Sequence, residues 1–290
     1  MASIIKKDQV WLEKFGNDAR VVTVFSIANE NEFSPLTDGF NQMLLVVTDE
    51  KQSCNYHTHY IREGRRVQER WIHLEGLRSW ILNGQNRYII NWIVSGEILY
   101  DKNRYGLELR QELKRFPDYL RNQKLFIEFS FFLRKYLQGK DFLKQKQVFD
   151  AHMSLLEALN HWARISIIET GKHPELTVWE QIETINPGIF KLYEELTTNQ
   201  ETIEKRVELV LLACEFSVMT KMKESCKVLL DVIASRKSGW TAIELKEHED
   251  LRELHVEFSL VLNKLVNRSI LKEESRQNEY GELIIAYRLA

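Results

Sequence analysis

Residues that interrupt helices are scarce along this chain, and this scarcity constrains its fold more than any other feature. The 290 residues include 12 glycines and 4 prolines, well below the roughly 12% that the two make up on average. From residue 118 onward, apolar residues recur at spacings of three and four, as in helices that bury one face. The clearest rows are Phe126, Phe129, Leu133 and Tyr136; Val148, His152, Leu155, Leu159 and Trp162; and Ile203, Val207, Val210, Cys214 and Val218. The pattern predicts long amphipathic helices joined by short loops, which is a helical bundle.

The pattern of apolar residues changes near residue 118 and divides the chain there. Before it, β-branched and apolar runs predict strands at 20–27, 43–48 and 66–74, and helices are expected at about 77–96 and 106–116. After it, Gly139, residues 171–174 and residues 186–188 are expected to end helices. Residues 1–117 are therefore expected to form an α/β domain and residues 118–234 a helical bundle.

Residues 235–290 are expected to form a third domain. Thr241 is a favourable N-cap for a short helix that ends near residue 247, and a longer helix is expected from about 250 to 267. Strand-like segments at 270–272 and 283–289 flank a polar turn at 276–281. Two helices followed by a β-hairpin resemble a winged helix. The sequence therefore predicts an α+β multidomain chain.

Charge and apolar patterning exclude several classes of protein. Forty basic and 42 acidic residues give a net charge of −2, so the chain as a whole is not a polyelectrolyte suited to nucleic acid or anionic membranes. The sequence contains no run of 18 uncharged apolar residues, so no membrane span is predicted. The cysteines Cys54, Cys214 and Cys226 match neither a zinc pattern nor a disulfide framework. A soluble, cytoplasmic protein without a membrane partner is expected.

Two motifs in the first domain carry a family resemblance. A strand that ends in Phe25-Ser26 is followed by a polar loop, and Asn41-Gln42-Met43 then stands directly before the apolar run 44–47; the second motif, S-G-E-I-L-Y-D, covers residues 95–101. Together they resemble the nucleotidyltransferase superfamily, of the kanamycin nucleotidyltransferase kind. In that family Gly-Ser ends one strand, Ser-Asp-x-Asp opens the next, and G-x-x-L-Y-D closes the domain. The likeness spans most of residues 1–230 and is strongest to uncharacterised bacterial nucleotidyltransferase-like proteins that add a C-terminal winged helix.

The resemblance implies a metal site that this sequence does not complete. Such enzymes hold Mg²⁺ with two carboxylates at positions i and i+2 of a strand, which leave the same face. Those positions carry Asn41 and Met43 here, a neutral amide and a soft thioether that suit Mg²⁺ poorly. Both are expected to point into the cleft, and Phe25 is expected to add bulk where the family has its glycine. The site is interpreted as degenerate, with no catalytic residue and no metal ligand; Mg²⁺ is expected only if activity remains.

Two other acids are candidate substitutes for the missing pair. Asp38 lies three residues before Asn41, and Glu69 is the one carboxylate on the strand expected to supply the family's third acid. Each also has a purely structural interpretation. Asp38 suits a turn beside Gly39, and Glu69 suits an ion pair or a solvated position.

A run of arginines is the candidate phosphate-binding feature. Together with the strand-end serine, the candidate nucleotide-binding residues are Ser26, Arg62, Arg65 and Arg66. Arg70 belongs to the same run, which Glu63 and Glu69 interrupt. Converging guanidinium groups bind phosphate oxygens two at a time, whereas a solvated hairpin with paired charges is the simpler interpretation. His57, His59 and His73 share strand parity, but no spacing completes a metal set.

The expected winged helix carries little positive charge. Nine Lys and Arg stand against ten Asp and Glu from residue 236 to the end, and Asp250, Glu253 and Glu257 fall on the expected second helix. Because cations provide most non-specific affinity for DNA, this region favours a protein partner or a second copy of the chain. Leu283, Ile285 and Tyr287 on the last strand suit such contacts.

Three functions remain open at this point. The leading hypothesis is a non-catalytic nucleotidyltransferase-like protein that binds a nucleotide, a nucleic acid or a protein partner. The second is an active, metal-dependent nucleotidyltransferase with atypical ligands. The third is a DNA-binding regulator that acts through the winged helix.

Overall fold

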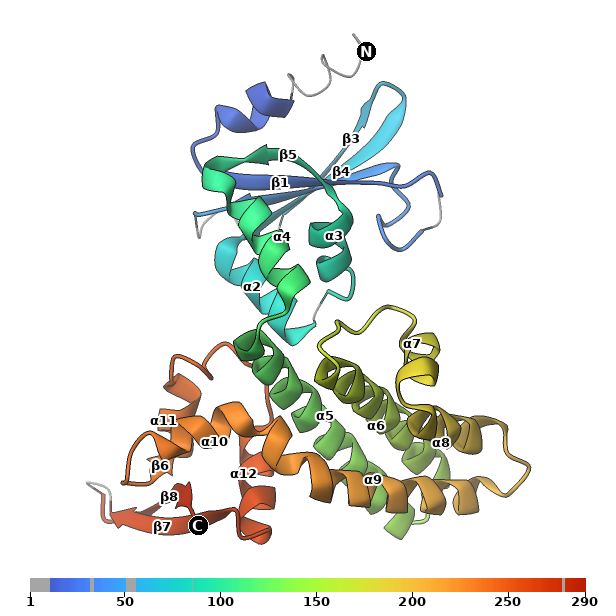
Figure 1. Cartoon of the computed structure of the whole chain (residues 1–290), viewed down its shortest axis with the longest axis vertical. Helices are drawn as coiled ribbons and strands as arrows, with labels where there is room; N and C mark the ends of the chain where they lie inside the picture. Colours follow the sequence, from blue (N-terminus) through green and yellow to red (C-terminus); the bar gives the residue numbers. More distant parts are fainter. Residues whose placement is uncertain (1–10, 32–33, 51–55, 85, 278–279) are drawn as a thin grey trace. The chain divides into compact units, whose positions relative to one another are not determined.

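The computed structural model describes residues 11–31, 34–50, 56–84, 86–277 and 280–290. The chain divides into two compact units, Met1–Pro117 and Asp118–Ala290 (Figure 1). Among the described residues, no helix is long and apolar enough to cross a membrane. Cys214 and Cys226 are buried thiols outside any disulfide, and burial raises the pKa of both. Cys54 lies outside the described residues.

The first unit is built on a five-stranded mixed sheet in the order β3-β4-β2-β1-β5. Its strands are β1 (Val21–Ala28), β2 (Gln42–Thr48), β3 (His57–Arg62), β4 (Arg65–His73) and β5 (Glu97–Asp101). Strands β2 and β4 are parallel, and the other neighbours are antiparallel. β1 and β2 are almost entirely buried, as expected of central strands covered on both faces.

Different elements cover the two faces of this sheet. The helices α2 (Leu74–Asn83), α3 (Ile89–Ser95) and α4 (Tyr105–Arg115) lie on one face (Figure 1). A short helical segment at residues 11–16 lies on the other, where Trp11 and Phe15 pack in a cluster with Leu44 and Val46. We call these the helix face and the open face.

The three strands predicted in this unit are confirmed to within a residue or two, but the edge strands β3 and β5 were not predicted. β3 is polar and mostly exposed, so it lacks the apolar alternation that identifies a half-buried strand. The single helix expected at 77–96 is in fact two helices. Gly84, with φ 65, ends α2 in the left-handed conformation that glycine adopts without steric cost.

The second unit contains the expected bundle. Its helices are α5 (Asp118–Lys144), α6 (Val148–Glu169), α7 (Val178–Ile185), α8 (Pro187–Thr198), α9 (Ile203–Ser225) and α10 (Lys227–Ala234). The predicted core row of α5 is buried. The expected break at Gly139 is wrong, because α5 continues through this residue. An added Cβ there would lie 3.1 Å from the side chain of Leu155 on α6, so this glycine allows close helix packing instead.

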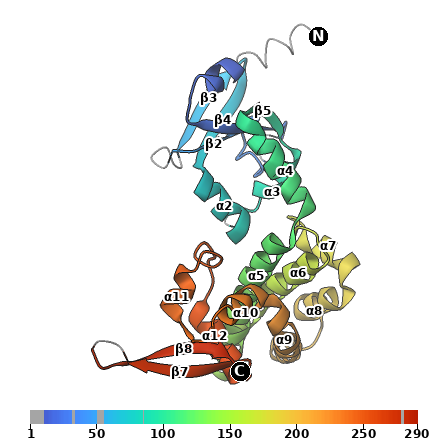
Figure 2. The ribbon, with the colours of Figure 1, turned by 60° about the vertical axis from the view of Figure 1, so that its left-hand side comes forward.

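The end of the chain adds two helices and a small sheet to the second unit. They are β6 (Trp240–Thr241), α11 (Ala242–Glu247), α12 (Phe258–Asn267), β7 (Leu271–Gln277) and β8 (Leu283–Leu289), with sheet order β6-β8-β7 (Figure 2). Thr241 caps α11 in a capping box with Glu244, as its sequence position predicts. Of the expected turn at 276–281, residues 278–279 lie outside the described part.

The helix predicted from about residue 250 begins only at Phe258. Residues 250–257 form turns and extended chain, so Asp250, Glu253 and Glu257 precede α12 and do not lie on it. Glu257 is held there by an ion pair with Arg134, and its backbone N–H donates to Ser130 Oγ at 2.9 Å. These long-range contacts override the local helical pattern.

Candidate functional site

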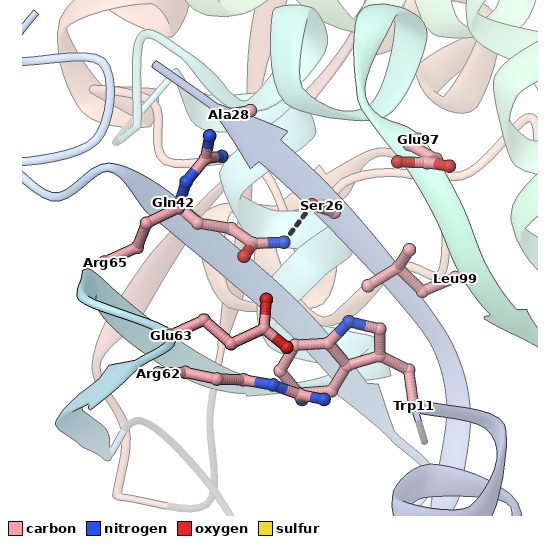
Figure 3. A pocket seen from close by; sticks show the side chains of 9 residues that line it. All are labelled: Trp11, Ser26, Ala28, Gln42, Arg62, Glu63, Arg65, Glu97 and Leu99. Atoms are coloured by element: carbon pink, nitrogen blue, oxygen red, sulfur yellow. Dashed lines mark hydrogen bonds between the residues drawn. The ribbon is translucent and has the colours of Figure 1, made fainter. Parts of the chain in front are cut away.

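A pocket opens on the open face of the first unit, beside the end of the β3–β4 hairpin. Its lining residues are Trp11, Ser26, Ala28, Gln42, Arg62, Glu63, Arg65, Glu97 and Leu99 (Figure 3). Gln42 Nε2 donates to Ser26 Oγ at 2.8 Å across β1 and β2. Ser26 therefore lies in the pocket, two residues before β1 ends at Ala28.

Strand pairing decides which residues of β2 face this pocket. Ala28 pairs with Gln42 and Ser26 with Leu44, and directly paired residues of antiparallel strands share a face. Met43 pairs with Ile27 instead, is fully buried and lies on the helix face. The expectation that Met43 points into the cleft is wrong, because side chains alternate along a strand and the register differs by one residue.

Asn41 and Phe25 also lie away from the pocket. Asn41 precedes β2, and its Oδ1 accepts a hydrogen bond from the backbone N–H of Arg66 at 2.9 Å. Phe25 is fully buried, and its ring lies 3.2 Å from the position of a Cβ on Gly106 of α4. Phe25 therefore fills the core under the helix face. The expectation that its bulk narrows the phosphate site is wrong.

The sheet separates the arginines that the sequence places together. Arg62 and Arg65 are paired at the end of the hairpin and both line the pocket; the guanidinium of Arg62 lies 3.9 Å from the centre of the Trp11 ring. Arg66 lies over Phe40 at 4.8 Å, and Arg70 lies over Trp92 at 5.3 Å. Two of the four arginines therefore line the pocket, and their guanidinium groups point in different directions (Figure 3).

Glu69 is buried on the open face but has several partners. It pairs with Leu44 across the parallel strands β2 and β4 and forms an ion pair with Lys14. Tyr60 Oη donates to the same carboxylate at 2.6 Å, and burial, followed by this bond, raises the pKa of Tyr60. Trp71 Nε1 donates to it at 3.3 Å. Of its two structural interpretations, the ion pair is the one observed.

Asp38 lies on the other side of the sheet from Glu69. It forms an ion pair with Arg70 and accepts from Gln68 Nε2 at 3.4 Å. Gln68 and Arg70 alternate with Glu69 along β4, so they occupy the helix face. Asp38 has φ 50 and precedes Gly39, with φ 76, which fits the turn interpretation. Asp38 and Glu69 therefore cannot hold one metal ion together.

These donors do not fit the magnesium site that the resemblance implies. The β2 residues on the open face, Gln42 and Leu44, supply no carboxylate, so correcting the register by one residue does not restore the pair. Glu63 and Glu97 line the pocket from the hairpin turn and from β5. Across the described residues, no group of three or more His, Cys, Asp or Glu could hold a metal ion.

The size of the pocket limits what it can enclose. Its volume is about 160 Å³, below the roughly 300–1,000 Å³ of sites that enclose a whole small molecule. Arg62 and Glu63 lie by Trp11 at one end, and Glu97 projects from β5 at another (Figure 3). A pocket of this size suits one phosphate group of a larger ligand.

The histidines considered above for a metal site, His57, His59 and His73, do not come together in one site. His57 and His59 lie on the exposed edge strand β3, and burial and the charge of Arg70 lower the pKa of His57. His73 Nδ1 accepts from the backbone N–H of Glu75 and caps α2. Sequence reasoning did not identify Trp11, Gln42 or Glu97 as pocket residues. The one usable signal was the Ser-Gly-Glu start of the second motif, which places Glu97 at a strand end.

Comparison with known proteins agrees with this architecture. Residues 1–121 match a family model described as nucleotidyltransferase-like, and residues 122–221 match one described as a YgxA-like substrate binding domain. The chain is 35% identical over 250 residues to the uncharacterized protein YgxA of Bacillus subtilis (strain 168), a match that covers 86% of this chain and 85% of YgxA. The crystal structure of a nucleotidyltransferase-like protein from Exiguobacterium sibiricum 255-15 superimposes with a TM-score of 0.88 at 27% identity, covering 97% of this chain and 98% of that one. The chain therefore belongs to the family of YgxA, in which a nucleotidyltransferase-like domain precedes a YgxA-like substrate binding domain.

Proposed function

We propose that the first unit binds a phosphate-bearing ligand, a nucleotide or a short polynucleotide, and does not transfer a nucleotidyl group. One observation carries this proposal. Arg62 and Arg65 line a pocket to which β2 contributes Gln42, a neutral amide, where the nucleotidyltransferases that the sequence resembles carry carboxylates. A guanidinium group can bind two phosphate oxygens at once, so it can hold such a ligand without a metal ion.

The charge of the pocket predicts weak, salt-sensitive binding. Arg62 and Arg65 are formally balanced by Glu63 and Glu97 among the lining residues. The carboxylates repel a phosphate, and solvent screens charges near the surface. Ser26 and Gln42 add neutral polar groups beside the arginines. The arrangement therefore supports binding of one phosphate group, with the rest of the ligand outside the enclosed volume.

The active-transferase hypothesis makes the opposite prediction for the same carboxylates. If Glu63 and Glu97 held Mg²⁺, nucleotide binding would need the metal, and Glu97→Gln would weaken it. If the pocket binds phosphate directly, binding persists in EDTA, and Glu97→Gln strengthens it by removing a repulsive charge. The two hypotheses therefore differ in the sign of one measurement.

Arg65→Ala and Arg66→Ala form a matched pair for the main test. The two residues are adjacent and exposed, but Arg65 lines the pocket while Arg66 lies over Phe40. We expect Arg65→Ala to weaken binding of labelled ATP or a short RNA about 5- to 10-fold, as for one partly exposed charged hydrogen bond. Arg66→Ala should bind like the wild type. Equal losses in both variants, or loss of binding in EDTA, would reject the proposal.

An exposed apolar stripe on α9 favours a second candidate function, self-association. Leu209, Leu212, Phe216 and Met219 are 49–68% exposed, and their spacing of three, four and three places them on one face of the helix. In an antiparallel pair of α9 helices from two copies, Leu209 would meet Met219 and Leu212 would meet Phe216. Because the stripe is complementary to itself, we name a second copy of this chain as the occupant.

Sedimentation velocity tests the self-association. Leu212→Glu is expected to convert dimer to monomer, since it places a charge at the centre of the stripe. Phe149→Glu on α6 is the control, because Phe149 is 73% exposed and lies outside the stripe. A monomeric wild type, or equal effects of the two variants, would exclude this candidate.

The order of elements at the end of the chain supports our third, architectural proposal. α11, α12 and the β7–β8 hairpin follow one another, as in a winged helix, and we propose this architecture for residues 235–290. Of the interface residues predicted on β8, Leu283 is 70% exposed while Tyr287 is buried. α12 carries one charged residue, Lys264, so duplex DNA is not expected to bind this region at physiological salt.

A further inference from the structure

Two side chains of opposite charge line the pocket of the first unit without pairing. Arg65 lies on β4 and Glu97 on β5. Among the described residues, neither the guanidinium group of Arg65 nor the carboxylate of Glu97 forms a hydrogen bond or an ion pair. Glu63, the other acid of the pocket, already has an interaction of its own. Arg65 and Glu97 are therefore available to a ligand.

The sheet keeps these two charges apart. In the strand order β3-β4-β2-β1-β5, two strands separate β4 from β5, so the two backbones lie three strand spacings, about 14 Å, apart across the sheet. Glu97 is level with Leu44 of β2 through Ser26, whereas Arg65 lies four residues further along the strands, about 13 Å. The two side chains cannot reach each other, so only an elongated ligand can contact both.

Neutral polar and apolar groups lie between the two charges. Ser26 pairs with Glu97 across β1 and β5, and Gln42 donates to Ser26 from β2. In Figure 3, Ser26 lies between Arg65 and Glu97. Leu99 also lines the pocket, two residues beyond Glu97, and packs against the cluster that contains Trp11. The pocket therefore offers hydroxyl and amide groups in its middle and an apolar surface beside Glu97.

We propose that this pocket selects guanine nucleotides, with the phosphate at Arg65 and the base at Glu97. The inference rests on the phosphate pocket proposed above and names its ligand. A carboxylate only accepts hydrogen bonds, and its two oxygens lie side by side. The N1–H and N2–H groups of guanine point the same way along one edge of the base. Both can therefore donate to Glu97, in the paired geometry that strengthens contacts with a charged group.

The other bases place an acceptor next to the donor that would meet Glu97. In adenine and cytosine a ring nitrogen that accepts lies beside the amino group, and in uracil the N3–H lies between two carbonyl oxygens. Each of these bases offers Glu97 one hydrogen bond and one repulsive contact, and a site built for two donors discriminates against such ligands. Because Glu97 is exposed, water competes for its carboxylate and keeps the expected discrimination near tenfold.

Competition with labelled ATP in EDTA tests this selection on the full-length protein. Displacement of the label by GMP, IMP or AMP is followed by fluorescence anisotropy. GMP is expected to bind about tenfold more tightly than AMP, and IMP, which keeps N1–H but lacks the N2 amino group, should fall between them. The three nucleotides carry the same phosphate group, so their differences report on the contact with the base.

Glu97→Gln is expected to change the affinities for guanine and adenine nucleotides in opposite directions. GMP should bind about tenfold more weakly to this variant, whereas ATP should bind more tightly because a repulsive charge is gone. Glu108→Gln is the matched control, because Glu108 is exposed on α4, on the helix face, and its removal changes the net charge equally. Arg65→Ala should weaken GMP and AMP by the same factor and leave their ratio unchanged.

The outcomes separate this inference from the phosphate pocket on which it rests. If labelled ATP binds and depends on Arg65, but GMP and AMP compete equally, the pocket stands and the selection of guanine is refuted. Tighter GMP binding by Glu97→Gln, or equal effects of Glu97→Gln and Glu108→Gln on GMP, would refute it as well. Absence of all nucleotide binding would overturn the pocket and the inference together.

Discussion

Removing the charge of Glu128 should destabilise the second unit strongly at neutral pH. Burial raises the pKa of this carboxyl, but Arg164 and His161 outweigh burial and bring it to about 2, against its usual 4.5. One pKa unit corresponds to about 1.4 kcal/mol, so the charged form contributes about 3 kcal/mol. Glu128→Gln should therefore lower the free energy of unfolding by about 3 kcal/mol at pH 7.

The pH dependence follows from the direction of this shift. Because the folded pKa lies below the unfolded one, the stabilisation is complete above about pH 4.5 and is lost as pH falls toward 2. The groups that face Glu128 are Lys124 on its own helix and His161 and Arg164 on α6. The difference between wild type and Glu128→Gln should therefore be largest at pH 5–7 and shrink toward pH 2.

Urea unfolding followed by tryptophan fluorescence measures this difference. Trp162, which lies 5.8 Å from Phe132 within the second unit, provides a local signal. Glu157→Gln is the control, because Glu157 pairs with Lys135 but is 49% exposed; its removal should cost less than about 1 kcal/mol. Equal stability of Glu128→Gln and wild type at pH 7, or a gap that does not narrow between pH 5 and pH 2, would refute the reasoning.

Three further predictions concern both units. Met43→Asp, which would rebuild part of the family's acid pair, should instead destabilise the first unit by at least about 4 kcal/mol, because Met43 is fully buried on the helix face; stability within 1 kcal/mol of wild type would contradict this. Glu97→Gln should tighten ATP binding in EDTA about 2- to 5-fold by removing a pocket carboxylate, measured by fluorescence anisotropy; weaker binding would favour the metal-dependent hypothesis. Gly139→Val should lower the free energy of unfolding by about 1–3 kcal/mol, because its side chain would crowd Leu155; an unchanged urea midpoint would count against this packing.

The types of the elements were largely predictable from local sequence. The apolar rows at spacings of three and four predicted the bundle, and the continuous run at 44–47 predicted a buried strand. Both signals are local, because each depends only on which residues follow one another within one element. The edge strand β3 gave no such signal, since its polar residues are mostly exposed and its strand conformation depends on pairing with β4.

The candidate site was only partly predictable, and Met43 shows the reason. The sequence indicated where the strand lies but not which of its two faces meets the pocket, and a shift of one residue exchanges the faces. Arg65 and Arg66 are adjacent in sequence, yet one lines the pocket and the other lies over Phe40. The residue types therefore indicated candidates for the site, but the sequence did not indicate which way their side chains point.

By itself, the sequence determined the α+β composition, the change at residue 118 and the absence of a carboxylate pair at the motif positions. Only the tertiary structure decided that Lys14 forms an ion pair with Glu69, that Asp38 pairs with Arg70 on the opposite face of the sheet, and that His161 and Arg164 both contact Glu128. The physical reason is the range of the interactions. Periodicity reflects burial along one element, whereas these ion pairs join residues 32 to 55 positions apart, whose proximity exists only after the chain has packed.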